Sequence, residues 1–367
     1  MKVAIIHDWL TGMRGGEKVL ESMCELYPEA DIFTLIYNKE KVSDKIKKHK
    51  ITASFLQHIP GVFKTYRNFL PLFPLAIESF NLGKYDLVLS SSHCVAKSVK
   101  THKGTTHICY CHTPMRYAWS HFSEYFSLER TGRLKYKLVS LIMPWLRSWD
   151  VKTADRVTHY VANSDTVAAR IKEYYKREAV TIYPPVDTDF YKAAPETIKE
   201  DFYLMVSALT EYKKVDFAIN VFNKLKDKKL VIIGTGPLFD KLKATAGPNI
   251  SMLGFCSNAE ILAHYRKAKA FIFPGEEDFG ITVVEAQACG TPVLAFHKGG
   301  AVETVVAGVT GEFFDGTQED FVKTLEKMDK TIYNGIEIRK NSEKFSRQIF
   351  EKKYFEYVQK AQRENTK

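Results

Sequence analysis

The sequence predicts an α/β protein of two domains, each built on a parallel sheet. Short apolar runs alternate with longer amphipathic segments, which is the pattern of strand and helix units in parallel α/β domains. This pattern starts a second time near residue 203. At 367 residues, the chain is also too long for one core of ordinary size and fits two domains.

The expected elements follow this alternation along the chain. In the first half, we predict buried strands at Val3–Ile6, Asp31–Ile36, Leu87–Ser90, His107–Cys111 and Val157–Ala162, with helices that include Lys18–Leu26 and Thr166–Tyr175. In the second half, we predict strands at Tyr203–Ser207, Leu230–Ile233, Ile250–Leu253, Ala270–Phe273 and Pro292–Ala295, with helices near Asp216–Lys226, Asn258–Lys267 and Ile281–Cys289. An amphipathic helix is expected after Ser342.

The boundary between the domains is expected at the pair Pro184-Pro185. Two consecutive prolines forbid helix and force an extended connection, so we predict a hinge there. The predicted domains are residues 1–186 and 187–345. Residues 346–367 are expected to form a helix that packs back on the first domain.

Composition narrows the class of protein. Apolar residues make up 45 % and charged residues 26 % of the chain, which excludes fibrous and largely disordered proteins. The apolar run at the N-terminus is stopped by His7 and Asp8, too early for a signal peptide, and no apolar stretch is long enough to span a membrane. The six cysteines, Cys109 and Cys111 included, lack metal-ligand spacing, so we expect reduced core thiols and a cytoplasmic protein.

The net charge of +10 is concentrated in the first half. Residues 1–187 carry 27 Lys and Arg against 18 Asp and Glu, and the remainder carries 26 against 25. Such a field suits an anionic partner, either nucleic acid, a diphosphate-bearing lipid or an acidic membrane surface. Nucleic acid is disfavoured because the chain has no zinc spacing, recognition helix or interleaving of aromatic and basic residues.

The segment Leu134–Trp149 admits two interpretations. It mixes bulky apolar residues with Arg147, Lys135 and Lys137. It is either a core or hinge-flanking helix that Pro144 ends or kinks, or a segment that contacts a membrane surface or a lipid acceptor.

The most informative segment is Phe273–Ala286. A predicted strand runs into a loop that holds Glu277, Gly280 permits close backbone approach, and a helix begins at Ile281 with its first N–H groups unpaired. That helix start suits an anion such as a diphosphate. The carboxylate of Glu285, one turn into the helix, can accept hydrogen bonds from the two hydroxyls of a ribose, and Glu277 can do so for a sugar. The alternative is an exposed acidic loop and a surface glutamate.

This segment resembles glycosyltransferase family 4, a retaining family of GT-B fold with a Glu-x7-Glu signature. Glu277 and Glu285 match the signature, and Gly290-Thr291-Pro292-Val293 matches its sequel. The resemblance implies two Rossmann-like domains facing across a cleft, with the nucleotide sugar bound mainly by the second and the acceptor by the first. It also implies that no metal or other cofactor is required.

The resemblance extends to the segment after the first strand of the second domain. Family members show an Arg and then a Lys here, both holding the donor diphosphate. Lys213 matches the Lys, whereas Ala208 stands where the Arg is expected. Lys214, or Arg14 or Arg116 of the first domain, is a candidate for the missing charge. Otherwise the activity is low or absent.

Further candidate residues follow from the same comparison. His112, after the fourth strand, matches a family histidine close to the transferred sugar, or is a structural histidine. With Lys213 and Glu277 it completes the predicted catalytic set. The predicted donor-binding residues are Gly15, Gly16, Lys213, Lys214, Phe255, Glu277, Phe279, Gly280, Ile281 and Glu285. For Phe255, buried packing is an equal alternative.

Other matches to the family carry less weight. The turn at Gly234–Gly236 is equally well explained as a simple connection between strand and helix. The pair Asn163-Ser164 is interpreted as structural, and His297–Gly300 with Glu303 resembles a loop of the second domain that borders the family's cleft.

The segments around Glu277 and Lys213 most resemble mannosyltransferases of surface-polysaccharide assembly. The resemblance therefore implies transfer of mannose from GDP-mannose to a lipid-linked or oligosaccharide acceptor, by an enzyme that is peripheral at the inner face of a membrane. Three alternatives remain. They are a UDP-hexose-dependent transferase, an epimerase or phosphorylase of the same fold, and a degenerate sugar-nucleotide-binding protein without activity, which Ala208 favours.

Overall fold

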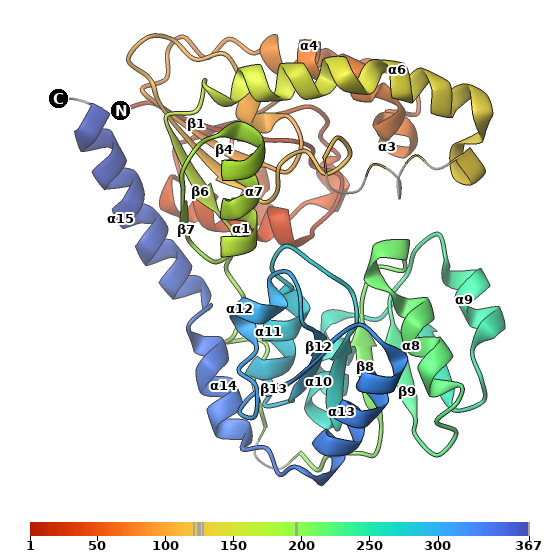
Figure 1. Ribbon diagram of the computed structural model, residues 1–367. Helices are drawn as coiled ribbons and strands as arrows, with labels where there is room; N and C mark the ends of the chain where they lie inside the picture. The colour runs from red at the N-terminus through yellow and green to blue at the C-terminus, as the bar shows by residue number, and fades with distance from the viewer. Residues whose placement is uncertain (120–121, 123–125, 127, 195–196, 366–367) are drawn as a thin grey trace. The chain divides into compact units, whose positions relative to one another are not determined.

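The computed structural model describes residues 1–119, 122, 126, 128–194 and 197–365 (Figure 1). The chain divides into two compact units. Unit 1 comprises Met1–Pro185 and Gln348–Lys367, and unit 2 comprises Val186–Arg347. Each unit is a parallel sheet covered by helices, so the α/β fold class with two Rossmann-like domains is confirmed.

The sheet of unit 1 is parallel throughout, in the order β3-β2-β1-β4-β5-β6-β7. Its strands are β1 Val3–His7, β2 Asp31–Thr34, β3 Ile51–Ala53, β4 Leu87–Ser92, β5 Thr106–Cys111, β6 His159–Ala162 and β7 Ala179–Thr181. Its helices are α1 Gly15–Leu26, α2 Asp44–Lys47, α3 Val62–Thr65, α4 Phe73–Glu78, α6 Leu128–Ala154, α7 Asp165–Tyr175 and α15 Arg347–Asn365. Four 3₁₀ segments are η1 Lys39–Lys41, η2 Phe55–His58, η3 Tyr66–Leu72 and η4 Ala96–Ser98 among the described residues.

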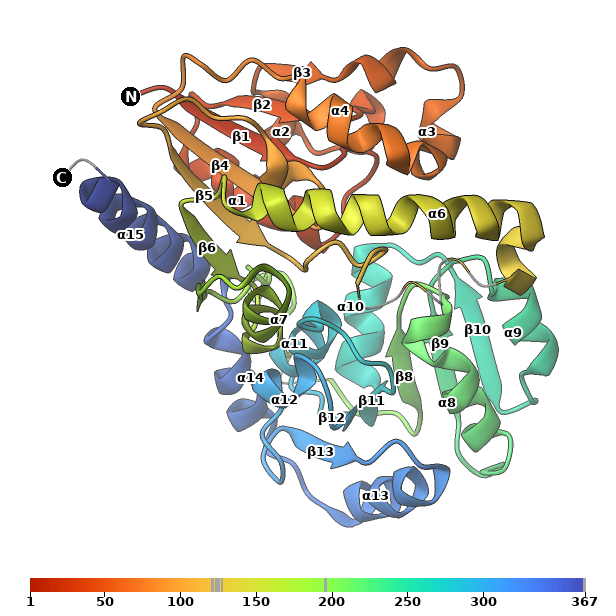
Figure 2. The ribbon, with the colours of Figure 1, turned by 45° about the horizontal axis from the view of Figure 1, so that its top comes forward.

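Alternate residues of β1 enter two separate cores, one on each face of this sheet. Ala4 and Ile6 pack with α4 and α6, whereas Val3 and Ile5 pack with α1, α2 and α15. The rings of Phe350 and Tyr354 on α15 lie 5.6 and 6.0 Å from the ring of Tyr110 on β5. The last helix therefore completes the core of unit 1, and Figures 1 and 2 both show it beside the strands.

Helix α6 corrects the expectation for Pro144. The helix continues through Pro144, and its non-helical residue is Gly132, with φ 74° and ψ 161°. Proline fits helical φ and costs only one hydrogen bond here, while buried Met143 and Leu146 hold the helix on the sheet at both sides of it. The core interpretation therefore holds for this face of α6.

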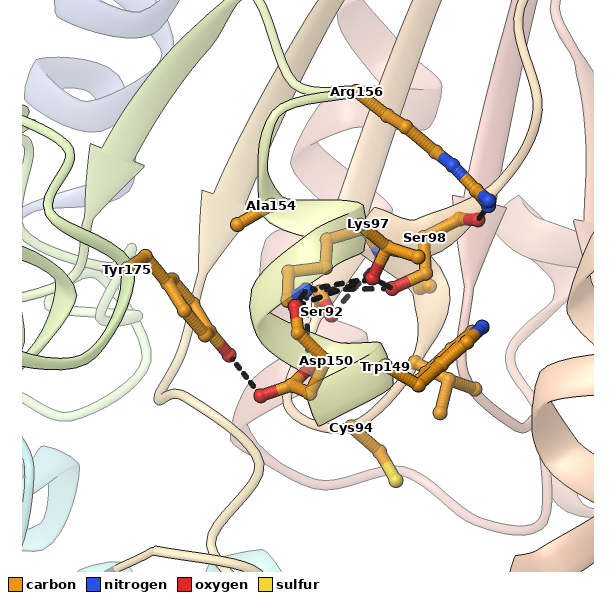
Figure 3. A network of polar contacts seen from close by, with 12 residues as sticks. Ser92, Cys94, Lys97, Ser98, Trp149, Asp150, Ala154, Arg156 and Tyr175 are labelled. Atoms are coloured by element: carbon orange, nitrogen blue, oxygen red, sulfur yellow. Dashed lines mark hydrogen bonds and ion pairs between the residues drawn. The ribbon is translucent and has the colours of Figure 1, made fainter. Parts of the chain in front are cut away.

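A buried ion pair anchors α6 to the segment after β4 (Figure 3). The Nζ atom of Lys97 lies 3.0 Å from Oδ1 of Asp150, and the two side chains are 1 % and 0 % exposed. Tyr175 and Trp119 each donate a 2.8 Å hydrogen bond to Oδ2 of Asp150. Burial and the nearby Asp150 charge raise the pKa of Tyr175 well above its ordinary value, so its hydroxyl remains a donor. Oδ2 of Asp150 thus accepts two hydrogen bonds, whereas Oδ1, which has no hydrogen-bond partner, faces the charge of Lys97.

A second buried polar pair joins β4 to β5. Ser90 Oγ is 2.8 Å from Nε2 of His107, whose Nδ1 is 3.1 Å from the carbonyl oxygen of Arg156. Burial lowers the pKa of His107 to about 4, so the ring is neutral at pH 7. Nδ1–H then donates to Arg156, and Nε2 accepts from Ser90.

The sheet of unit 2 is also parallel, in the order β10-β9-β8-β11-β12-β13. Its strands are β8 Tyr203–Val206, β9 Leu230–Ile233, β10 Ile250–Gly254, β11 Ala270–Phe273, β12 Val293–Phe296 and β13 Gly311–Phe314. Its helices are α8 Val215–Phe222, α9 Phe239–Thr245, α10 Asn258–Lys267, α11 Ile281–Ala288, α12 Ala301–Thr304, α13 Gln318–Lys330 and α14 Gly335–Glu343, and η5 Glu211–Lys213 is a 3₁₀ turn. Tyr203 and Met205 face one core, and Leu204 faces the other.

The direction in which the chain adds strands reverses at one place in each sheet. In unit 1, β1 lies between β2 and β4, and in unit 2, β8 lies between β9 and β11. Open parallel sheets bind ligands outside the carboxyl ends of the strands at such a reversal. The loops after β1 and β4 and those after β8 and β11 are therefore the places to look for a site.

The cysteines lie where the sequence predicted. Five are buried, Cys256 is half-buried, and all six are free thiols. Among the described residues, no helix is both long and apolar enough to cross a membrane. No group of three or more His, Cys, Asp or Glu side chains in that part of the chain is placed to hold a metal ion.

Candidate active site

Lys213 and Glu277 come together at the reversal point of the unit 2 sheet. Lys213 ends the 3₁₀ turn after β8, and Glu277 lies in the loop after β11. Their side chains form an ion pair, with 13 % and 22 % of their surfaces exposed. Two of the three predicted catalytic residues therefore share one partly buried position, although 64 residues separate them in the chain.

Two glycines allow these loops to approach. A Cβ atom on Gly275 would lie 2.6 Å from the carbonyl oxygen of Tyr212, closer than any side chain tolerates. A Cβ atom on Gly300 would lie 2.3 Å from Cα of Phe279, and the Gly300 amide donates a 2.8 Å hydrogen bond to the carbonyl oxygen of Glu277. The Glu277 loop is thus held from both sides by backbone contacts that require glycine.

Helix α11 begins directly after this loop. Gly280 precedes it with φ +84°, a left-handed conformation that favours glycine, and Ile281 is the first helical residue. The ring of Phe279 is buried and lies 5.6 Å from the ring of Phe345. Because this ring is part of the core, Phe279 contributes only its backbone to the border of the Glu277 loop. The helix start, whose first N–H groups have no partner in a preceding turn of helix, therefore follows Glu277 by four residues in the chain.

Glu285 is held one turn into α11. The hydroxyl of Tyr265, on α10, donates a 3.1 Å hydrogen bond to Oε2 of Glu285. Burial and the nearby Glu285 charge raise the pKa of Tyr265 well above its ordinary value. The tyrosine is therefore a permanent donor that orients the carboxylate.

The remaining predicted residues of unit 2 are exposed. Lys214 has φ 53° and precedes α8, with its side chain in solvent. Phe255 follows β10 and is 84 % exposed, so the alternative of buried packing is wrong. Ala208, in place of the family's Arg, is also exposed.

In unit 1, His112 lies at the carboxyl end of β5 and contacts two other segments. Its Nε2 is 2.8 Å from Oγ of Ser91, at the end of β4. A Cβ atom on Gly16 would lie 3.6 Å from the same nitrogen. Gly15 and Gly16 are the first residues of α1, so this helix start lies against the histidine.

Two further histidines surround His112, and sequence reasoning did not find either of them. His7 Nδ1 is 3.1 Å from Ser91 Oγ. The ring centroid of His93 is 6.3 Å from that of His112, and its Nδ1 is 3.2 Å from Oδ2 of Asp8.

Asp8 fixes the turn that carries His93. Its buried carboxylate accepts hydrogen bonds of 2.6–2.9 Å from the backbone amides of residues 93–96. Four amide donors on one carboxylate tie the backbone of residues 93–96 to Asp8. The turn after β4 is therefore rigid where it meets the histidines.

Known protein families account for almost the whole chain. Residues 13–190 match the model described as Glycosyltransferase Family 4, and residues 187–348 match the model described as Glycosyl transferases group 1. The chain belongs to glycosyltransferase family 4. The recognition made from Glu277 and Glu285 is thereby confirmed.

Curated relatives of this family 4 chain share about half of its length. A GDP-mannose-dependent alpha-(1-6)-phosphatidylinositol monomannoside mannosyltransferase of Mycolicibacterium smegmatis is 33 % identical in an alignment 172 positions long that covers 38 % of this chain and 44 % of that protein. A D-inositol 3-phosphate glycosyltransferase of Thermobifida fusca is 28 % identical in an alignment 210 positions long that covers 48 % of each chain. The chain spans about half the length of the curated relatives it matches.

Solved structures agree over the full length. Anabaena HepE, solved in complex with UDP, superimposes with a TM-score of 0.70 at 17 % identity and covers 98 % of this chain and 100 % of its own. The lipopolysaccharide outer core galactosyltransferase WaaB gives 0.65 at 18 % identity, covering 96 % and 98 %. These neighbours confirm the GT-B fold of the family 4 chain.

Several residues of this family 4 chain have structural roles. Ser164 accepts a hydrogen bond from the Val167 amide and caps α7, as expected for a structural Asn-Ser pair. Gly234 and Gly236 pass so close to the carbonyl oxygens of Ser207 and Leu209 that a Cβ atom at either position would overlap them. The G-x-G turn therefore has a packing role between the β8 and β9 loops.

Proposed function

We propose that this protein is a retaining glycosyltransferase that moves mannose from GDP-mannose to a lipid-linked or oligosaccharide acceptor in surface-polysaccharide assembly. The observation that carries the proposal is the Lys213–Glu277 ion pair beside the start of α11, at the reversal point of the unit 2 sheet. A cation, an anion-binding helix start and a carboxylate are the three groups that a diphosphate-linked sugar requires.

The proposed donor pose assigns one role to each group. The diphosphate lies at the N–H groups of α11 and beside Lys213. Glu277 accepts hydrogen bonds from sugar hydroxyls, and Glu285, oriented by Tyr265, accepts them from the ribose. Lys213 exchanges its contact with Glu277 for one with the phosphate as the donor binds.

The proposed reaction depends on charge development at the diphosphate. When the bond between sugar and phosphate breaks, negative charge grows on the leaving group, and Lys213 with the α11 amides stabilises it. One such preorganised donor contributes about 3–4 kcal/mol in well-measured enzymes. The acceptor hydroxyl attacks from the face that the diphosphate leaves, gives its proton to the diphosphate, and so retains the anomeric configuration. We propose that no metal takes part, and turnover in the presence of EDTA tests this.

The choice of donor rests on the relatives. The name of the Mycolicibacterium smegmatis relative says that it depends on GDP-mannose, whereas HepE was solved with UDP. To decide, the purified chain is incubated separately with GDP-mannose, UDP-glucose and UDP-galactose, and nucleotide release is measured. We expect release from GDP-mannose. Release from the UDP-sugars alone would replace the proposal by a UDP-hexose-dependent transferase, and tight binding without release would indicate the degenerate binder that Ala208 favours.

We further propose that unit 1 meets an anionic bilayer through the outer face of α6. Leu134, Leu138, Leu141 and Trp145 recur every three or four residues and are 85, 57, 77 and 52 % exposed. Unit 1 carries 32 Lys and Arg against 20 Asp and Glu, a net of +12, whereas unit 2 carries 21 against 23. An apolar stripe with a tryptophan on a basic domain is typical of proteins that bind membrane interfaces.

Vesicle sedimentation tests this surface. Replacing both Leu134 and Leu141 with Glu should lower partition onto phosphatidylglycerol vesicles by about tenfold or more, because two apolar side chains are lost and two negative charges are added. Ile332→Glu is the control, since Ile332 is 98 % exposed but belongs to unit 2. Equal partition of the wild type onto neutral phosphatidylcholine vesicles would contradict the anionic-lipid assignment.

A further inference from the structure

A line of polar groups connects Glu17 to His112 inside unit 1. Oε1 of Glu17 lies 3.9 Å from Nε2 of His7, and Nδ1 of His7 lies 3.1 Å from Oγ of Ser91. The same oxygen lies 2.8 Å from Nε2 of His112. Glu17, His7 and Ser91 are buried, so their protons have few alternative partners.

The carboxylate of Glu17, at one end of this line, determines which atom is the donor in each hydrogen bond of the line. Burial by itself would raise the pKa of Glu17, but His7, His93 and the local backbone lower it overall, so the group is ionised at pH 7. An ionised carboxylate only accepts hydrogen bonds. The Nε2 atom of His7 is buried without a hydrogen-bond partner and faces that charge at 3.9 Å. A proton on Nε2 is attracted to the carboxylate, whereas a lone pair there would be repelled.

The hydroxyl of Ser91 links the protonation of His7 to that of His112, because it donates to one ring and accepts from the other. In a neutral His7 ring with its proton on Nε2, Nδ1 has a lone pair and accepts from the Ser91 hydroxyl; this neutral form is part of the proposal. The Ser91 oxygen, having given its only proton to His7, accepts from Nε2–H of His112. Burial, together with the positive charge of Arg116, lowers the pKa of His112 well below its ordinary value, so the ring carries one proton. That proton is on Nε2, and Nδ1 keeps its lone pair.

The other groups around His112 support a neutral ring. His93 packs on one side with its own pKa lowered by burial, and its Nδ1 faces the Asp8 carboxylate. Arg116 adds positive charge four residues along the chain. The start of α1 lies against Nε2 through Gly16.

We propose that Glu17, His7 and Ser91 are positioning residues that hold His112 as the tautomer with its proton on Nε2, so that Nδ1 accepts a hydrogen bond from a sugar hydroxyl. The hydrogen bond between His112 and a sugar hydroxyl rests on the proposed function, whereas the assignment of the His112 tautomer does not. Ser91 is the necessary link because its one hydroxyl touches both rings.

Histidine tautomers are read directly by NMR. In the wild-type chain labelled with ¹⁵N-histidine, long-range ¹H–¹⁵N spectra should show His112 with a protonated Nε2 and an unprotonated Nδ1, the signal being assigned by its absence in His112→Asn. Ser91→Ala should shift His112 toward a mixture of tautomers. A wild-type His112 protonated on Nδ1, or carrying two protons at pH 7, would overturn the proposal.

Kinetics supply the second measurement, with a matched control on the same strand. Ser91→Ala should lower kcat for mannosyl transfer about tenfold, as the loss of one orienting hydrogen bond does, with little change in KM for the donor. Ser90 is as buried as Ser91 and bonds to a different histidine, His107. Ser90→Ala should therefore leave kcat unchanged. Ser91→Thr, which keeps the hydroxyl, should restore most of the rate.

The two measurements separate this inference from the proposed function. If the predicted tautomer is found and responds to Ser91→Ala, but no nucleotide sugar is turned over, the positioning residues stand and the transferase proposal fails. If transfer is measured but Ser91→Ala and Ser90→Ala behave alike in both spectrum and kcat, the positioning role fails and the transferase proposal stands.

Discussion

Lys213→Ala should lower kcat for glycosyl transfer by about 100- to 1,000-fold. Lys213 is the cation at the reversal point of unit 2, and in the proposed reaction it stabilises charge that grows only as the diphosphate leaves. Removing one preorganised group that acts mainly in the transition state has an effect of this size. Because Ala208 replaces the family's second cation, no neighbouring arginine on that segment can compensate.

The controls for Lys213 distinguish catalysis from general charge. Lys226→Ala removes an exposed lysine from the same unit and should leave kcat within about twofold. Steady-state kinetics with saturating donor measure both variants, and isothermal titration with GDP-mannose measures donor affinity. Unchanged turnover in Lys213→Ala would mean that the residue only neutralises Glu277, and would favour a protein that binds sugar nucleotides without transferring the sugar.

The sequence could place four of the predicted donor-binding residues together because they are local in the chain. Glu277, Gly280, Ile281 and Glu285 lie within nine residues, so one strand, loop and helix place them together. The buried strand β11 and the helix α11 both occurred near their expected bounds. Lys213 was found only through the family resemblance, since no local pattern relates it to a loop 64 residues away.

The residues that the sequence did not reveal act through contacts between distant segments. Gly275 and Gly300 matter because of what a Cβ atom would overlap, and Tyr265 matters because α10 brings it to Glu285. His7 ends β1 and His93 follows β4, and only the order in which β1, β4 and β5 pair brings them to His112. A single sequence does not contain that order.

Two of the three strands that the sequence did not predict, the third being β13, have a similar cause. The strands β3 and β7 are three residues long, and their side chains are half-buried or exposed, so neither forms a buried apolar run. Helix α13, which we did not predict either, carried a readable pattern. Thr317 caps it, and Phe321, Thr324, Leu325 and Met328 are buried at helical spacing.

Lys97→Met should destabilise unit 1 by about 3–5 kcal/mol, the usual cost of leaving a buried charge without its partner. Methionine fills a similar volume, so packing changes little and the loss is electrostatic. Asp150, 0 % exposed, would keep the hydrogen bonds from Tyr175 and Trp119 but lose its only buried cation among the described residues. Because the pair joins η4 to α6, the weakened contact lies between the β4 turn and the longest helix of the unit.

Tryptophan fluorescence isolates this effect, because Trp9, Trp119, Trp145 and Trp149 all belong to unit 1. Thermal unfolding followed in this way should give a midpoint lower by about 10 °C, at 2–4 °C per kcal/mol for a unit of this size. Lys100→Met is the matched control, since Lys100 is 59 % exposed and its ion pair with Glu78 is worth at most about 1 kcal/mol. The double variant of Lys97→Met with Asp150→Asn should recover much of the loss, because no buried charge remains. Two results would contradict this prediction. Lys97→Met could lower the midpoint no more than Lys100→Met, or adding Asp150→Asn could lower it further. In either case α6 is held by its apolar face alone, and the buried ion pair contributes nothing to its attachment.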